Sequence, residues 1–244
     1  MRAILIAAFA LLTFIPVARA DIQDPVFLLN EGESLLHISA TERREVDQDL
    51  LIANLRIEVE DKSNKKVQND INTAMAKALD LAKKYDDVKA ITRGYNVHQY
   101  DRNGGRKNLA RDMVWKGNQS VQLKSKNAED LLELAGKIQE AGFLMNGLSY
   151  TLSPEVAAKV QDEMLEAALE KLQIRAERAS KALGKSKASL KEINTNGNYA
   201  PSPQVYARGM EMMSMAADSK MAAPVASPGE TTITMNVSAK AILR

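Results

Sequence analysis

The chain has 244 residues, with 33 basic and 31 acidic side chains and no cysteine. A nearly neutral chain offers no electrostatic basis for binding nucleic acid, and we expect no nucleic-acid partner. The lack of cysteine excludes disulfides, thiol catalysis, cysteine-based metal sites and a lipid-modified cysteine, so the apolar core alone must hold a protein of this length.

The first 20 residues have the three parts of a secretory signal peptide. Arg2 gives a basic start, residues 3–15 form an almost uninterrupted apolar run, and Ala18-Arg19-Ala20 is a small-residue cleavage site. The run is shorter than the roughly 20 residues of a transmembrane helix. We therefore predict a signal peptide at 1–20, cleaved after Ala20, and a periplasmic mature protein. Cleavage removes two basic residues and no acidic one, so the mature chain carries 31 of each sign.

The first part of the mature chain predicts a linker, two strands and a helix. Residues 21–31 are interpreted as a linker and residues 34–40 as a short strand. Apolar and polar residues alternate over 51–60, and this period of two indicates a half-buried strand. From 64 to 84 the apolar spacing becomes helical, and Ser63 or Asn64 can cap the helix by accepting a backbone N–H.

Residues 88–124 predict a long β-hairpin. The strand at 88–100 contains Gly94, which we expect to form a β-bulge. The Asn-Gly-Gly sequence within 101–105 is a strong turn signal. The return strand, 112–124, has one apolar face formed by Met113, Trp115, Val121 and Leu123.

Two more helices follow the hairpin. The first is expected to begin at Asn127, which can cap it, and to end at Gly142, and the strand 143–152 comes next. Ser153-Pro154 then begins a helix with one continuous apolar stripe that ends at Gly184. A helix of about 30 residues is about 45 Å long. It can extend beyond a compact domain and is available to pack on a partner subunit.

The C-terminal part predicts two strands separated by a long mobile loop. The strands cover 188–195 and 231–243, and the loop at 196–229 is rich in Met, Pro, Ala, Gly and Ser without an apolar period. From 49 to 152 the order is strand, helix, strand, strand, helix, strand, which is the split β-α-β pattern of ferredoxin-like sheets. We expect an α+β fold with antiparallel sheets, two amphipathic helices and one long third helix.

Five segments together form a recognisable pattern: residues 115–123, the helix through 131–138, the strand end at 148–153, the helix end at 179–184, and Pro228-Gly229-Glu230 before the last strand. They resemble the SIMPL-domain family of bacterial periplasmic proteins, formerly a domain of unknown function (DUF541). The resemblance implies a single domain over 32–244. Some family members are linked to defence against oxidative stress and some assemble into large rings, so it also implies a homo-oligomer. It supplies no catalytic residues, because none is established for the family.

Few side chains indicate a catalytic, metal-binding or partner-binding site. The two histidines, His37 and His98, lie in separate expected strands and have no metal-ligand spacing, so we interpret them as ordinary polar strand residues. The basic residues around the hairpin turn could meet an acidic partner or lipid headgroups, but in a neutral chain a solvated hairpin tip is the favoured interpretation. These residues are Arg102, Arg106, Lys107 and Arg111. We predict no catalytic site and no cofactor.

A methionine cluster is the one compositional anomaly. Five of the 11 methionines fall in the expected loop, at positions 210, 212, 213, 215 and 221. Thioether sulfur is a soft ligand that suits Cu(I), and methionine also oxidises reversibly to the sulfoxide. The favoured interpretation is that these are adaptable apolar side chains in a biased linker or against a neighbouring subunit. The candidate metal ligands are Met210, Met212, Met213 and Met215.

The sequence therefore favours a non-enzymatic periplasmic protein that forms homo-oligomers and serves defence against envelope or oxidative stress. The alternative is a periplasmic protein that binds Cu(I) or Ag(I) through its methionine-rich loop. In both cases the mature chain is expected to lack a transmembrane segment, and a peripheral association with the envelope is compatible with either role.

Overall fold

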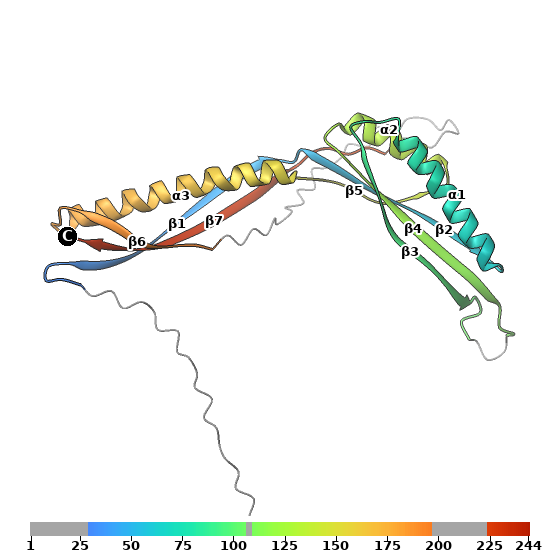
Figure 1. Cartoon of the computed structure of the whole chain (residues 1–244), viewed down its shortest axis with the longest axis horizontal. Helices are drawn as coiled ribbons and strands as arrows, with labels where there is room; N and C mark the ends of the chain where they lie inside the picture. Colours follow the sequence, from blue (N-terminus) through green and yellow to red (C-terminus); the bar gives the residue numbers. More distant parts are fainter. Residues whose placement is uncertain (1–28, 106–108, 197–223) are drawn as a thin grey trace, which may run out of the picture.

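A computed structural model describes residues 29–105, 109–196 and 224–244. They form an α+β protein with two antiparallel sheets, as the sequence predicts. The molecule is bent and has two lobes (Figure 1). The central lobe contains residues 50–151. The terminal lobe combines the first strand with the chain from 154 onward.

The central lobe confirms the split β-α-β pattern. Its four strands lie in the order β3-β4-β2-β5, so that β4 lies between β2 and β3. All neighbouring strands are antiparallel. The elements are β2 (Leu50–Asp61), α1 (Asn64–Ala82), β3 (Lys89–Asp101), β4 (Met113–Ser125), α2 (Ala128–Glu140) and β5 (Leu144–Thr151).

Local sequence signals fix the boundaries of these elements. The Ser63 and Asn127 side chains accept hydrogen bonds from backbone N–H groups three residues ahead and so cap α1 and α2. Gly142 follows α2 with a φ of +98°, which favours glycine. Gly94 has a φ of +49°, and the β3–β4 register shifts between Arg93 and Asn96, so the predicted bulge is confirmed.

The core of the central lobe lies between its sheet and the two helices α1 and α2. Alternate residues of β2 and β4 point into it, because side chains in a strand alternate between faces. Each large apolar side chain buried there contributes about 1.5–3 kcal/mol relative to an exposed one. The fully buried large residues are Leu51, Leu55, Val67, Ile71, Leu123, Leu131, Leu134 and Ile138.

The terminal lobe is a three-stranded sheet covered on one face by a long helix. The strands lie in the order β1-β7-β6, with bounds Ser34–Asp47, Glu230–Leu243 and Ala188–Asn196 respectively. The helix α3 (Pro154–Ala182) buries Met164, Ala168 and Leu172 against them. On β7, Ile233, Val237, Ala239, Ala241 and Leu243 are buried, as their alternation predicts.

The length of α3 matches its own sheet. Its 29 residues span about 44 Å, and the 14 residues of β1 or β7 span about 47 Å. The apolar stripe of α3 is therefore used within the chain, and the expectation that this helix packs on a partner subunit stays a prediction. Residues on the opposite side of α3 stay exposed.

One strand boundary and the exposure of one side chain differ from the sequence prediction. The first strand runs to Asp47 rather than Ala40. Glu42 and Arg44 face α3, where they form ion pairs with Lys171 and Glu163 respectively. Because these inward-facing residues are charged, residues 41–47 lack the apolar–polar alternation by which a strand is predicted. Met113 shares the face of Trp115 and Val121 but is 42% exposed. The reason is that β2 ends at Asp61, opposite Trp115, so this end of β4 extends beyond the start of α1.

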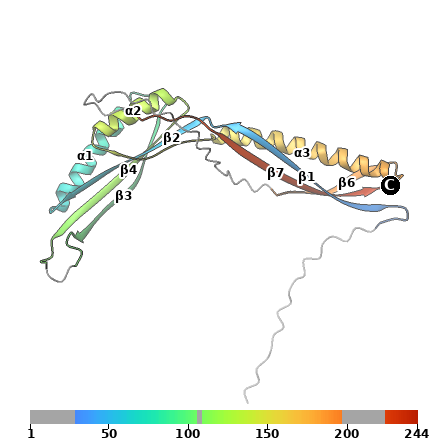
Figure 2. The same cartoon turned by 180° about the vertical axis from the view of Figure 1, so that it is seen from behind.

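The two lobes meet at a polar junction. The Asp49 carboxylate accepts hydrogen bonds from the Ser153 N–H and hydroxyl, both at 2.7 Å, and its ion pair with Lys126 Nζ measures 2.8 Å. The Gln48 N–H donates to the Gly229 carbonyl at 2.9 Å. All three helices lie on the outer side of the bend and both sheets line its inner side (Figures 1 and 2).

Three sequence predictions concern residues that the structure does not describe. The signal peptide (1–20), most of the linker (21–31) and most of the loop at 196–229 lie outside the described residues. Across the described ranges, no helix combines the length and the apolar character that a bilayer crossing demands.

Candidate functional site

The sheet of the central lobe has one face without helices, which we call the open face. It consists of the even-numbered residues of β2 and β4 and of the β3 and β5 residues paired with them. Strand alternation places these side chains opposite the apolar core. The odd-numbered positions of β2 and β4 supply the core, so the same alternation that builds the fold also builds the open face.

A polar ladder crosses three strands of the open face. The Arg93 guanidinium on β3 donates to the Gln122 side-chain oxygen on β4 at 3.0 Å. The Gln122 amide donates in turn to Asn54 on β2 at 2.9 Å. Cross-strand hydrogen bonds of this kind fix the register and hold the side chains in place.

The first acidic group along β2 is Glu58. Its carboxylate pairs with Arg56 on the same strand and with Lys116 on β4. The hydrogen bond from Lys116 lowers the pKa of Glu58, and burial opposes this effect. Glu58 is therefore neutralised within the sheet, and it stays ionised at neutral pH.

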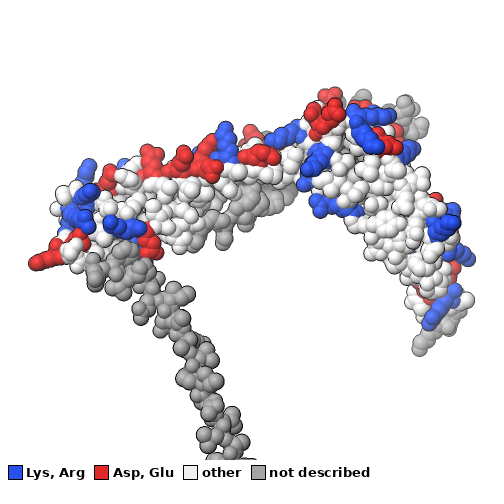
Figure 3. All heavy atoms as spheres, in the orientation of Figure 1, with Lys and Arg blue, Asp and Glu red and all other residues white. Residues whose placement is uncertain are grey.

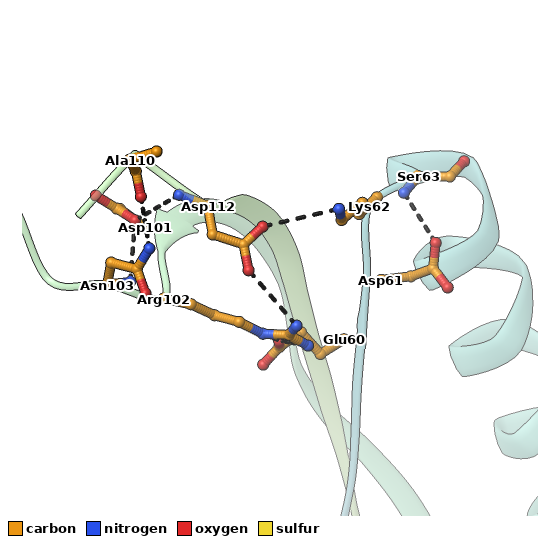
Figure 4. A network of polar contacts seen from close by, with 9 residues as sticks. All are labelled: Glu60, Asp61, Lys62, Ser63, Asp101, Arg102, Asn103, Ala110 and Asp112. Carbon is orange, nitrogen blue, oxygen red and sulfur yellow. Dashed lines mark hydrogen bonds and ion pairs between the residues drawn. The ribbon is translucent and has the colours of Figure 1, made fainter.

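A second network surrounds Glu60 near the hairpin end of the sheet (Figure 4). The Tyr100 hydroxyl donates to the Glu60 carboxylate at 2.5 Å, and the Arg102 guanidinium pairs with the same carboxylate. These hydrogen bonds lower the pKa of Glu60, and the bond to Glu60 raises the pKa of Tyr100. Arg102 also lies 3.8 Å from Asp112, whose other oxygen is 3.9 Å from Lys62 Nζ.

The hairpin turn is held by Asp101. Its carboxylate accepts from the backbone N–H groups of Asn103 and Asp112 at 3.0 and 2.9 Å, which lowers its pKa. The Asn103 amide donates to the Ala110 carbonyl at 2.5 Å (Figure 4). Of the four basic residues that the sequence places here, Arg102 is ion-paired and Arg111 lies near Asp101, while residues 106 and 107 are outside the described ranges.

The end of the open face nearest the junction differs, because its charges are unpaired. Lys89 on β3 and Lys124 on β4 are directly opposite in the ladder. Neither has an ion-pair partner within residues 29–105, 109–196 and 224–244. Like charges at opposite positions destabilise a strand pair. Arg93 lies further along the same face and hydrogen-bonds only to a neutral amide.

The two histidines do not form a site. His37 is on β1 in the terminal sheet, paired with Lys240, and His98 is on β3 in the central sheet, paired with Lys116. Both side chains are exposed. The His98 ring is 6.3 Å from that of Tyr100. The prediction that they are ordinary polar strand residues agrees with these positions.

Metal ligands were predicted only in the methionine cluster. Met210, Met212, Met213 and Met215 lie outside the described residues. Among the residues that are described, no group of three or more His, Asp or Glu side chains has the arrangement of a metal site. The methionine site therefore stays a prediction.

The open face is not predicted as a functional surface from the sequence alone. The polar residues of β2 and β4 were visible as the complement of the apolar alternation. Their grouping into paired and unpaired charges depends on the register of three strands. Lys89 and Lys124 are 35 positions apart in the sequence and become neighbours only through the hairpin and its bulge at Gly94.

Fold and surface together define an α+β protein with two antiparallel sheets, each covered by helices on one face and carrying mainly polar side chains on the other. The SIMPL family, described as proteins of unknown function (DUF541), matches residues 36–241, and the chain belongs to this family. The match spans both lobes and confirms the resemblance found in the sequence. No curated protein matches the chain.

Solved structures that resemble parts of the chain share little of its sequence. A de novo designed protein, Foldit4, is 15% identical over 43% of this chain and 98% of its own, with a TM-score of 0.25. A protein of Burkholderia cenocepacia, provisionally described as an amidohydrolase/peptidase, is 13% identical over 59% of this chain and 34% of its own, also with a TM-score of 0.25. Likeness at this level carries no argument about function.

Proposed function

We propose that this SIMPL-family protein is a non-enzymatic, self-associating protein of the bacterial periplasm that contributes to defence against envelope or oxidative stress. The observation that carries the proposal is the open face, together with the polar inner face of the terminal sheet. Both faces are held by cross-strand hydrogen bonds and ion pairs, among them Gln122 with Asn54 and Thr41 with Asn236. Rigid, preorganised polar surfaces of this kind suit recognition of a partner.

Self-association is supported by how the sheets are covered. Domains are built from two, and occasionally three, packed layers of secondary structure. Here each sheet has helices on one side only, so a third layer can be supplied by another molecule. Residues 32–244 would act as one unit in such an assembly.

The export part of the proposal rests on the signal-peptide pattern of residues 1–20. It is tested by expressing the full chain with its natural leader in a Gram-negative host and measuring the intact mass of the protein released by osmotic shock. The proposal predicts a mature chain that begins at Asp21. A full-length chain retained in the inner membrane would contradict it.

The stress role is tested in the native bacterium by deleting the gene and measuring survival in hydrogen peroxide and in detergent. We expect reduced survival in at least one condition, restored by the wild-type gene. Unchanged survival in every condition would contradict the proposed role in stress defence. It would not bear on the proposed self-association.

The methionine cluster favours a second candidate function, binding of Cu(I) or Ag(I) by thioether sulfur. Cu(I) is titrated against a chromogenic chelator with the wild type and with a variant in which Met210, Met212, Met213 and Met215 are changed to Leu. Met113→Leu, at an exposed site on β4, is the control. Binding that the control retains and the quadruple variant loses supports the candidate. Equal binding by all three proteins would remove it.

A further inference from the structure

The open face carries uncompensated positive charge at its junction end. Lys89 and Lys124 lie side by side across the ladder, with Arg93 on the same face. Like charges at opposite positions of a strand pair repel, and no ion pair within the described residues offsets the repulsion between these two lysines. Because the mature chain is neutral overall, this concentration of positive charge is local.

One line of exposed residues in the first part of α3 carries the opposite charge. Asp162, Glu166 and Glu170 are spaced by four residues and therefore form one line along the helix. All three are exposed, and none has an ion-pair partner among the described residues. Acidic side chains at this spacing destabilise a helix. We call this line the acidic ridge; Figure 3 shows acidic side chains in a row along α3.

The two surfaces cannot meet within one molecule. The acidic ridge lies on the outer side of the bend, since α3 buries its other side against β1 and β7. The open face lies on the inner side, opposite α1 and α2 (Figure 2). A contact between them therefore requires a second copy, whose convex helical side would enter the concave bend of the first.

We propose that the open face binds the α3 acidic ridge of a second copy of this chain, so that the molecules associate head to tail. This inference rests on the proposed self-association and assigns its surfaces. A helix laid on the open face would complete a helix–sheet–helix sandwich with α1 and α2 on the other side. The contact joins two different surfaces, so it propagates into a ring or a filament rather than closing as a symmetric dimer.

Charge reversal tests the pairing. The face variant carries Lys89→Glu and Lys124→Glu, and the ridge variant carries Asp162→Lys, Glu166→Lys and Glu170→Lys. A control with Lys65→Glu and Lys77→Glu makes the same charge change as the face variant on exposed positions of α1. Light scattering gives the molar mass of each mature protein, and circular dichroism checks that each is folded.

The face and ridge variants are each expected to dissociate, with affinity reduced by about tenfold or more, and the control is expected to behave as wild type. An equimolar mixture of the two variants should reassociate, because each then offers the charge that the other lacks. A chain with all five substitutions should also self-associate. Assembly of the wild type should weaken in about 1 M salt, where the screening length is about 3 Å.

The outcomes separate the inference from the proposed function. A wild type that assembles, with both variants assembling equally well, overturns the assigned surfaces and leaves self-association standing. A monomeric wild type overturns both. If the face variant still assembles but loses binding to phosphatidylglycerol vesicles that the wild type binds, the open face serves a membrane surface and the inference is wrong.

Discussion

The Asp49 carboxylate receives two hydrogen bonds from one residue, the backbone N–H and the hydroxyl of Ser153, each at 2.7 Å. Asp49 lies between β1 and β2, and Ser153 caps the helix α3. The pair therefore joins two of the chain segments that pass between the lobes. Lys126 supplies the counter-charge at 2.8 Å. The junction is consequently polar, and its strength depends on the ionisation of Asp49.

Asp49→Asn is expected to destabilise the protein at neutral pH by about 1–2 kcal/mol, because it removes a charged acceptor. Burial alone would raise the pKa of Asp49, but the hydrogen bonds from Lys126 and Ser153 outweigh it and the pKa is lowered. A lowered folded-state pKa stabilises the fold above the unfolded value of about 3.9, and this contribution is lost as the pH falls through the folded value.

Urea unfolding of wild type and Asp49→Asn between pH 7 and pH 3 measures this effect. The difference in unfolding free energy should be constant near neutrality and should shrink below about pH 4. A difference independent of pH over the whole range would show that the Asp49 charge does not hold the junction.

Gly117→Ala is expected to destabilise the central lobe by about 1–3 kcal/mol through overpacking. A Cβ at this position on β4 would lie 2.5 Å from Ile71 Cδ1 and 2.6 Å from Val67 Cγ1. Both side chains are fully buried on α1 and have little room to move. Thermal unfolding provides the measurement.

The matched control is Gly136→Ala in the interior of α2, where a Cβ would meet nothing within 4 Å. It should stabilise the protein by about 0.5–1 kcal/mol, because alanine is the better helix former. Equal effects of the two substitutions would contradict the close approach of α1 to β4.

Glu60→Gln is expected to lower the pKa of Tyr100 toward its ordinary value. The hydrogen bond to the Glu60 carboxylate is the main cause of the raised Tyr100 pKa, because ionising the phenol places two negative charges together. Ultraviolet difference titration follows tyrosinate formation.

Glu58→Gln serves as the control, since Glu58 pairs with Arg56 and Lys116 rather than with Tyr100. Its tyrosine titration should shift much less than that of Glu60→Gln, because Glu58 acts on Tyr100 only through the neighbouring charges of Lys116 and Glu60. If Glu60→Gln leaves the titration unchanged, the network around the hairpin end of the sheet is not formed in solution.

The elements that the sequence predicted well are those with local causes. The alternation over Leu51–Glu60, the caps at Ser63 and Asn127 and the bulge at Gly94 each depend on a few neighbouring residues, and the structure confirms them. The order of β2 to β5 also followed, because alternating strands and helices leave few arrangements of a single sheet.

Other features depended on contacts between distant residues. The extension of β1 to Asp47 rests on its pairing with Glu230 at the far end of the chain and on ion pairs with α3. The unpaired lysines of the open face are defined by register across the hairpin. Composition showed a neutral chain and could not show that two unpaired lysines lie together on the open face and three unpaired acidic residues lie in line on α3.

The molar mass of the mature protein in solution is the most direct test of self-association. Light scattering coupled to size-exclusion chromatography at micromolar concentration should give a mass several times that of one chain, and the mass should fall when salt is raised. A single species with the mass of one chain, unchanged by concentration or salt, would contradict the account.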